Sequence, residues 1–167
     1  MNENYESFLN YFERIRERTV RVARCIPRDQ IDWSPKESKF SFADLLRHLA
    51  AIERYMYAEN SKFRPSRYSG HGKELANDYD EVFQFLERAH QESMEIFRSV
   101  TDEDLQKKCT VPSGQQITLW KWLRAMIEHE AHHRGQIYMM LGMLGVKTPP
   151  IYGLTEEEVH ARSVGMG

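Results

Sequence analysis

Three histidines within five residues are the feature of this sequence with the clearest chemical potential. They lie in the segment His129-Glu130-Ala131-His132-His133. On an α-helix four residues advance about 400°, so His129 and His133 lie one turn apart on one face and can point at one metal ion. His132 lies about 100° from His133, which makes His129 with His132 a weaker ligand pair. The spacing therefore favours a metal site over hydrogen-bonded interior histidines.

A functional metal site needs a further ligand, because catalytic zinc usually takes three protein ligands and a water. His48 is the best third candidate, since it lies within an apolar run of a helical segment. His90 is its rival, because it continues the apolar stripe of another segment at helical spacing. Periodicity alone gives His48 only a slight edge over His90, and His71 and His160 follow both.

Four long stretches of helical periodicity must position these residues. They cover residues 4–24, 41–60, 73–100 and 119–144, and a shorter one starts near residue 155. Ser41, Thr101 and Thr155 are each followed three residues later by an acidic residue, which predicts a capped helix start. Gly145 predicts the end of the last long helix. Residues 107–118 are expected to form a loop or a small hairpin.

The connections in this pattern permit helices to cross over. Two connections are long: the one between the first and second long helices, and the one between the third and fourth. Each is far longer than the roughly two to eight residues that join helices in a tight hairpin. We therefore predict an all-α fold: a four-helix bundle with long crossover connections and a short terminal helix, in a single domain over residues 1–167. The methionines at 139, 140 and 143 are expected to fill the core.

Composition excludes several functional classes. The 167 residues are 41% hydrophobic and 29% charged with a formal charge of −2, which argues against nucleic acid as a partner. The arginines between Arg14 and Arg24 alternate with glutamates and predict a solvated face. No apolar run approaches the ~20 residues that cross a membrane. Two distant cysteines, Cys25 and Cys109, and a start without a signal sequence predict a cytoplasmic protein with small buried thiols.

The chain resembles the DinB-like (YfiT-like) superfamily of four-helix metal proteins. The most specific match is the segment from His129 to Ile137, which looks like the family's His-x-x-x-His-Arg-Gly-Gln signature. The segment from Ser41 to Ala50 is similar to the family's second helix, which carries its first metal histidine. The resemblance implies that His48, His129 and His133 bind one divalent ion, zinc or nickel, with water in the remaining positions. It also implies that the second and fourth helices are adjacent and that the chain forms a homodimer.

The resemblance implies an activity as well. Family members that are enzymes are mainly thiol-dependent transferases, so the expected function joins a low-molecular-weight thiol to an electrophilic substrate. A metal-bound water or thiol, rather than an identified side chain, would carry the chemistry. One alternative is a non-catalytic metal-binding stress-response protein. Another is a zinc hydrolase with Glu130 as general base and a ligand from residues 156–158. Tyr11 and Tyr57 are the exposed aromatic candidates for a dimer interface.

Overall fold

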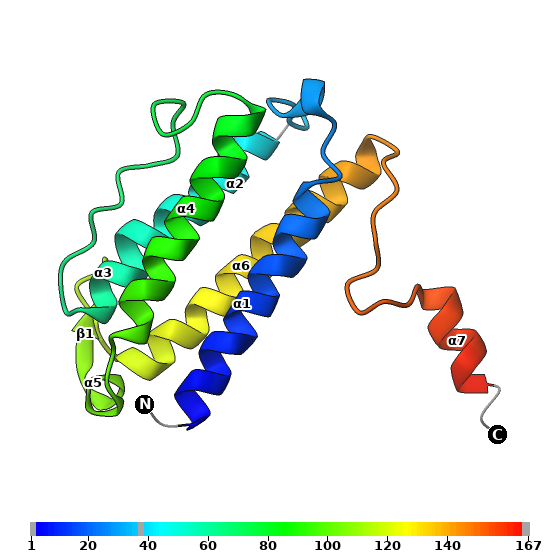
Figure 1. Ribbon diagram of the computed structural model, residues 1–167. Coiled ribbons are helices and arrows are strands. Elements are labelled where there is room, and N and C mark those ends of the chain that lie inside the picture. Colours follow the sequence, from blue (N-terminus) through cyan, green and yellow to red (C-terminus); the bar gives the residue numbers. More distant parts are fainter. Residues whose placement is uncertain (1–2, 37–38, 165–167) are drawn as a thin grey trace.

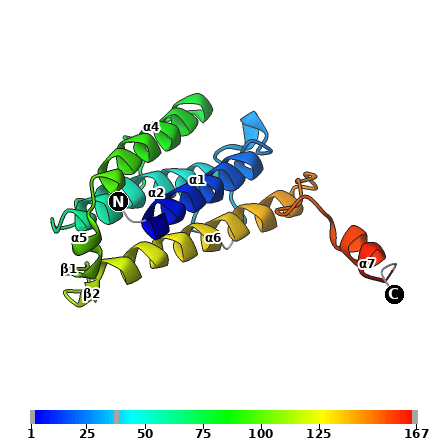
Figure 2. The same cartoon turned by 60° about the horizontal axis from the view of Figure 1, so that its bottom comes forward.

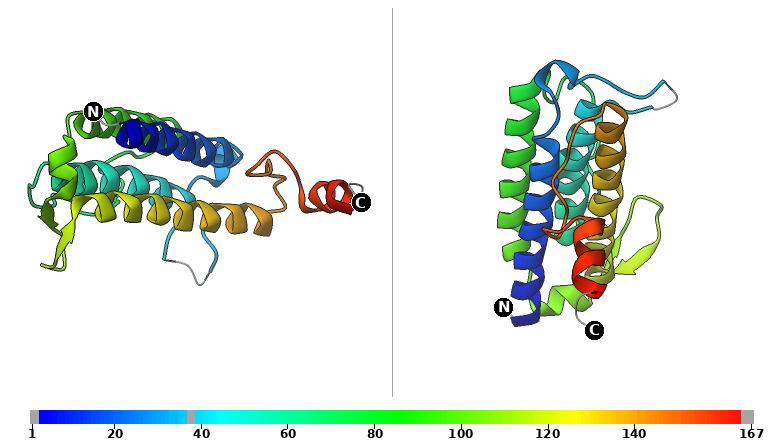
Figure 3. Two further views of the ribbon diagram at one scale, coloured as in Figure 1. Left: turned by 90° about the horizontal axis from the view of Figure 1, so that it is seen from below. Right: turned by 90° about the vertical axis from the view of Figure 1, so that its right-hand side faces the viewer.

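Four long helical segments form the body of the part described by the computed structural model, residues 3–36 and 39–164 (Figure 1). They are α1 (Glu3–Ala23), the continuous segment of α2 (Phe42–Ile52), η2 (Glu53–Tyr57) and α3 (Ala58–Ser61), α4 (Tyr79–Arg98) and α6 (Leu119–Met143). Seen from below, α1 and α4 form one layer, and α2, α3 and α6 form the other (Figure 3). The fold is the predicted all-α bundle.

The shorter elements close the ends of the bundle. They are η1 (Arg28–Gln30), α5 (Asp102–Gln106), strands β1 (Lys108–Thr110) and β2 (Gln116–Thr118), and α7 (Glu156–Val164). The two strands pair antiparallel with Cys109 opposite Ile117, so the segment before α6 is a hairpin rather than a loop. Helix α7 stands away from the bundle, at the end of an extended connection (Figures 1 and 2).

The helix order contains the predicted crossover. Helix α2 packs against both α4 and α6, while α1 packs against α6. The second and fourth long helices are therefore neighbours, although the whole of α4 separates them in sequence. A π-helical turn, η2, follows α2, and its widened hydrogen bond joins the Ala58 N–H to the Glu53 carbonyl. Such turns shift the register of the side chains that follow them and often lie near functional sites.

Helix caps explain where the elements begin. The Ser41 hydroxyl accepts a hydrogen bond from the Asp44 N–H (3.1 Å), and the Asp44 carboxylate accepts one from the Ser41 N–H (2.9 Å), which confirms the predicted start of α2. The prediction that α4 starts at residue 73 was wrong. Buried Arg47 binds the Ala76 carbonyl oxygen at 2.9 Å, an acceptor that a helix would use internally. Asp78 caps the helix instead, accepting from the Glu81 N–H.

Burial corrects three expectations about individual residues. Met140 lies in the core, but Met139 and Met143 are 66% and 61% exposed. They are four residues apart on the outward face of α6, about 100° and 60° from Met140 on the same side of the helix. Tyr57 is 4% exposed because its ring packs on Trp122 at 4.8 Å, so it is not available to an interface. None of the described helices has the length and apolar composition that crossing a membrane requires.

Candidate metal centre

Helices α2 and α6 bring together three of the predicted histidines. The Nε2 atom of His129 lies 3.0 Å from Nε2 of His48 and 3.1 Å from Nε2 of His133. One ring nitrogen from each residue lies within 4.8 Å of the other two. His129 and His133 share a face of α6, and α2 lies against that face. This group could hold a metal ion.

The outer ring nitrogens fix how two of these imidazoles are oriented. Nδ1 of His133 lies 2.7 Å from the Gln136 amide oxygen, which can only accept, so Nδ1 carries the proton. Nδ1 of His48 lies 2.7 Å from the Tyr68 hydroxyl, which is in turn 3.3 Å from Nδ1 of His71. A hydroxyl that donates to His71 accepts from His48. When Nδ1 carries the proton in both His48 and His133, each Nε2 keeps a lone pair directed at the centre of the cluster, as metal-ligating histidines require.

Burial keeps these imidazoles neutral. Burial and then the neighbouring His133 and His71 lower the pKa of His48 to about 4. Burial, together with His133 and His48, lowers the pKa of His129 to about 3. Burial also lowers the pKa of His133, although its hydrogen bond with Gln136 opposes the effect. Three neutral nitrogen lone pairs that converge repel one another, and a divalent cation would relieve that repulsion. The donor set therefore fits a borderline-soft divalent metal.

The remaining histidines are not part of this group. His90, the rival third ligand, lies 2.9 Å from the Glu53 carboxylate, on the side of the bundle that faces α1 and α4. His132 is exposed, as its position on the helix predicts, although its ring contacts that of His133. His71 reaches the cluster only through Tyr68, and His160 lies on the exposed α7.

A buried ion network lies behind the cluster and corrects the expectation for one arginine. Arg16 is 4% exposed instead of solvated, because both Glu130 oxygens bind it at 2.9 and 2.8 Å and Glu53 pairs with it too. Burial lowers the pKa of Arg16, but Glu130 and Glu53 outweigh that effect and raise it. Its Nη1 atom is buried without a hydrogen-bond partner in the described part of the chain. This network joins α1, η2 and α6 and restrains the rotation of α6 next to His129.

Tyr68 is the residue of the site that sequence reasoning missed. It lies in the irregular connection between α3 and α4, where no periodicity indicates which side chains face inward. It also borders a cavity of about 640 Å³ between this connection and the β-hairpin, whose other walls include Phe63 and Val111. The Tyr68 side chain thus links the histidine cluster to a space large enough for a small substrate.

Two proteins of Bacillus subtilis are similar to this chain, one of them along most of its length. YjoA of Bacillus subtilis strain 168 is 23% identical over 147 residues, which cover 86% of this chain and 93% of YjoA. YrdA of the same organism is 38% identical over 58 residues, about a third of either chain. The crystal structure of YjoA, a DinB-like protein, superposes with a TM-score of 0.69 at 18% identity, covering 87% of this chain and 96% of that one.

A second solved structure agrees in fold. A DinB-like protein from Bacillus cereus ATCC 10987 superposes with a TM-score of 0.68 at 15% identity, covering 87% of this chain and 95% of its own. At these identities the likeness concerns the fold. The sequence model of the DinB superfamily matches residues 11–137, a span that contains all three histidines of the cluster. The chain therefore belongs to the DinB superfamily.

Proposed function

We propose that this protein binds one divalent metal ion, zinc or nickel, through His48, His129 and His133, and that it transfers a low-molecular-weight thiol to an electrophile. The observation that carries the proposal is the donor set: three neutral imidazoles whose Nε2 atoms converge, without a carboxylate among them. A divalent ion held by neutral ligands keeps its full positive charge and would favour the thiolate form of a bound thiol.

The surrounding residues have positioning roles in this proposal. Tyr68 and Gln136 hold the outer nitrogens of His48 and His133, which fixes the direction of their lone pairs. The cavity beside Tyr68 would take the electrophile and the body of the thiol. In the reaction the thiolate sulfur attacks an electrophilic carbon, a carbon–sulfur bond forms and the leaving group departs with its electron pair. The thiol proton passes to solvent.

The protein's own thiols are unsuited to the role of nucleophile. Cys109 is 2% exposed, and burial raises the pKa of its thiol. Its sulfur lies 3.6 Å from the Ile117 carbonyl oxygen within the hairpin. Cys25 lies near the carboxyl end of α1, and its sulfur contacts the Arg21 carbonyl oxygen. The nucleophile would therefore come from a cosubstrate thiol.

The position of Glu130 favours transfer over hydrolysis. In a hydrolase of the His-Glu-x-x-His type, this carboxylate would activate a water. Here both of its oxygens bind the Arg16 guanidinium, and the side chain is 2% exposed. The acidic residues at 156–158, the alternative downstream ligand, lie on exposed α7.

Metal analysis is the first experiment. Protein purified with zinc or nickel should carry close to one ion per chain, and His48→Ala or His129→Ala should abolish binding. His132→Ala and His90→Ala are matched controls that should retain the metal, because neither imidazole joins the cluster. Full metal occupancy in the His48→Ala and His129→Ala variants would contradict the proposed three-histidine metal site.

Turnover is the second experiment. Metal-loaded protein is mixed with glutathione, bacillithiol or mycothiol and with a chromogenic aryl halide. The assay measures both the halide that is released and the thiol conjugate that forms. His48→Ala should remove the activity, while Glu130→Gln should keep most of it in whatever fraction remains folded. If the protein binds the metal but conjugates none of these thiols, the transferase proposal is wrong and the alternative of a non-catalytic metal-binding protein is favoured. Peptide cleavage that Glu130→Gln stops would identify a hydrolase.

A further inference from the structure

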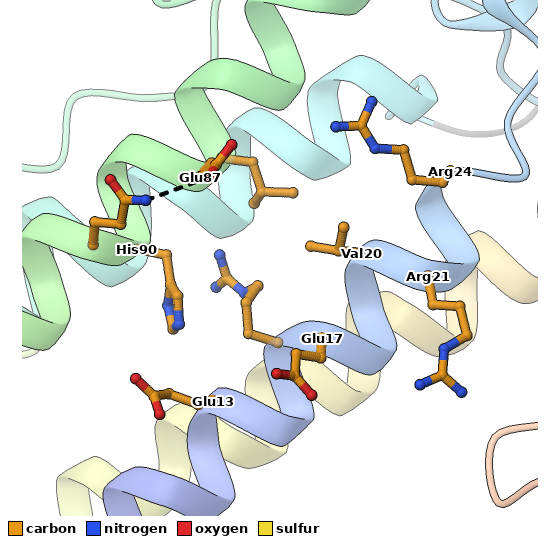
Figure 4. A pocket seen from close by; sticks show the side chains of 10 residues that line it. Glu13, Glu17, Val20, Arg21, Arg24, Glu87 and His90 are labelled. Carbon is orange, nitrogen blue, oxygen red and sulfur yellow. Dashed lines mark hydrogen bonds between the residues drawn. The ribbon is translucent and has the colours of Figure 1, made fainter.

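The cavity beside Tyr68 is lined by charge of a single sign. Among the described residues in its wall, only Arg64 is charged, and the others are apolar or neutral polar residues. The cavity of about 650 Å³ between α1 and α4 differs, because carboxylates from both helices line it together with Arg21 and Arg24 (Figure 4). Charges of both signs do not select a ligand by its charge, whereas a lone guanidinium favours an anion.

The backbone of Arg64 is fixed, and the end of its side chain is available. Its N–H donates to the Glu59 carbonyl oxygen (3.1 Å), and its carbonyl oxygen accepts from the Asn60 side-chain amide (2.9 Å). The side chain is 55% exposed, and its Nε lies 2.8 Å from the Glu59 carboxylate. Nη1 and Nη2 have no hydrogen-bond acceptor among the described residues. Arg64 can therefore bind a ligand's carboxylate through these two groups while it keeps its contact with Glu59.

The arginines around Arg64 leave positive charge uncompensated. The Glu59 carboxylate is buried, and Arg54, Arg64 and Arg67 each have a nitrogen 2.8 Å from it. Arg54 also binds Glu92 at 2.7 Å. Three guanidinium groups thus share two carboxylates, so this group of residues has one positive charge in excess. An anion bound at Arg64 would balance that charge.

Phe63, the residue before Arg64, gives the cavity an apolar wall at a cost to folding. Its φ is +57°, in the left-handed region that favours glycine. The residue is also 43% exposed, so its ring contributes little to the core. Both features oppose stability, and residues held in this way are typical of ligand-binding sites. The apolar part of a ligand in the cavity would cover the ring.

The distance between Arg64 and the histidine cluster suits a small organic thiol. Arg64 and Tyr68 are four residues apart, so their Cα atoms are at most about 14 Å apart. A thiol the size of a tripeptide spans about 10 Å. With its sulfur at the cluster beside Tyr68, such a molecule would reach Arg64 with its other end.

We infer that the thiol cosubstrate is a carboxylate anion, that Arg64 binds its carboxylate and that Phe63 packs on its body. This inference rests on the proposed function and names the class of thiol that the site takes. Glutathione and bacillithiol carry carboxylates, and mycothiol has none. Arg64 would thus determine specificity, so a carboxylated thiol should be accepted and mycothiol should be refused.

Binding of thioethers tests the inference without turnover. Isothermal titration calorimetry of the metal-loaded full chain uses the S-methyl derivatives of all three thiols, which cannot be conjugated. At least one carboxylated derivative should bind about tenfold more tightly than its own methyl ester and than the mycothiol derivative. Arg64→Gln should remove this preference and leave the metal content unchanged. Arg67→Gln is the matched control, because Arg67 pairs with the same carboxylate and is 60% exposed but does not line the cavity.

Several results would overturn the inference. They are equal or absent binding of acids and esters, a preference that persists in Arg64→Gln, and an equal loss of preference in Arg67→Gln. Conjugation of a thiol without any preference for acids would refute the role of Arg64 alone. A preference that depends on Arg64, without conjugation of any thiol, would refute the transferase and leave an anion-binding site.

Phe63→Gly separates ligand binding from folding. Glycine adopts a positive φ without strain, so the midpoint of urea unfolding should rise while the carboxylated thioether binds more weakly. A lower midpoint together with unchanged binding would show that the ring serves folding, and it would overturn the role of Phe63.

Discussion

Lowering the pH from 8 to 5 tests the environment of the histidine cluster directly. A metal must compete with protons for each imidazole, and an imidazole with an ordinary pKa of about 6.5 is protonated about thirtyfold over its neutral form at pH 5. Three such ligands would cost about 30,000-fold in apparent affinity. With pKa values of about 4 for His48 and about 3 for His129, these two remain mostly neutral at pH 5.

Protonation of His133 is then the main cause of any loss of metal affinity at pH 5, and burial lowers the pKa of this residue as well. We therefore predict that zinc affinity falls less than about thirtyfold between pH 8 and pH 5. Competition with a chromophoric chelator, calibrated at each pH, measures this. His132→Ala serves as the control, because the exposed imidazole is not a member of the cluster. A loss of about 10,000-fold with the fold intact would refute the reasoning, since the imidazoles would then titrate as they do in water.

The fold must be monitored in the same experiment. Because the folded pKa values of these histidines lie below the unfolded value of about 6.5, the unfolded chain binds more protons below that pH. The metal-free protein should therefore lose stability as the pH falls from about 6.5 towards about 4. Far-UV circular dichroism at each pH separates unfolding from proton competition.

Three further substitutions have defined outcomes. Tyr68→Phe removes the hydroxyl that holds His48 and should weaken metal binding about 10–100-fold in the same competition assay; unchanged affinity would contradict the positioning role. Arg16→Met leaves the Glu130 carboxylate buried without its cation and should cost about 3–5 kcal/mol in urea unfolding, so a cost below about 1 kcal/mol would count against the buried network. Gly145→Ala should lower stability by about 1 kcal/mol, because this residue has a φ of +69°, and an unchanged unfolding midpoint would oppose that account.

The sequence alone determined the features that depend on local geometry. The four-residue spacing of His129 and His133 predicts a shared helix face, because the pitch of the α-helix does not depend on tertiary contacts. The cap formed by Ser41 and Asp44 involves hydrogen bonds within one turn, and it was predicted correctly for the same reason. The start of α4 was mispredicted because Arg47, distant in sequence, binds the Ala76 carbonyl oxygen, which a helix starting at residue 73 would use internally.

Only the tertiary structure decided which inward faces meet. Periodicity places both His48 and His90 towards the interior, but it does not say which helix lies opposite each of them. The packing of α2 on α6 brings His48 to His129, whereas His90 meets Glu53. Arg16 looked solvated because its sequence neighbours are charged, yet two carboxylates from other helices accompany it into the core. The partner of a buried side chain depends on how whole helices pack. The residue pattern along one helix does not indicate which other helices lie against it.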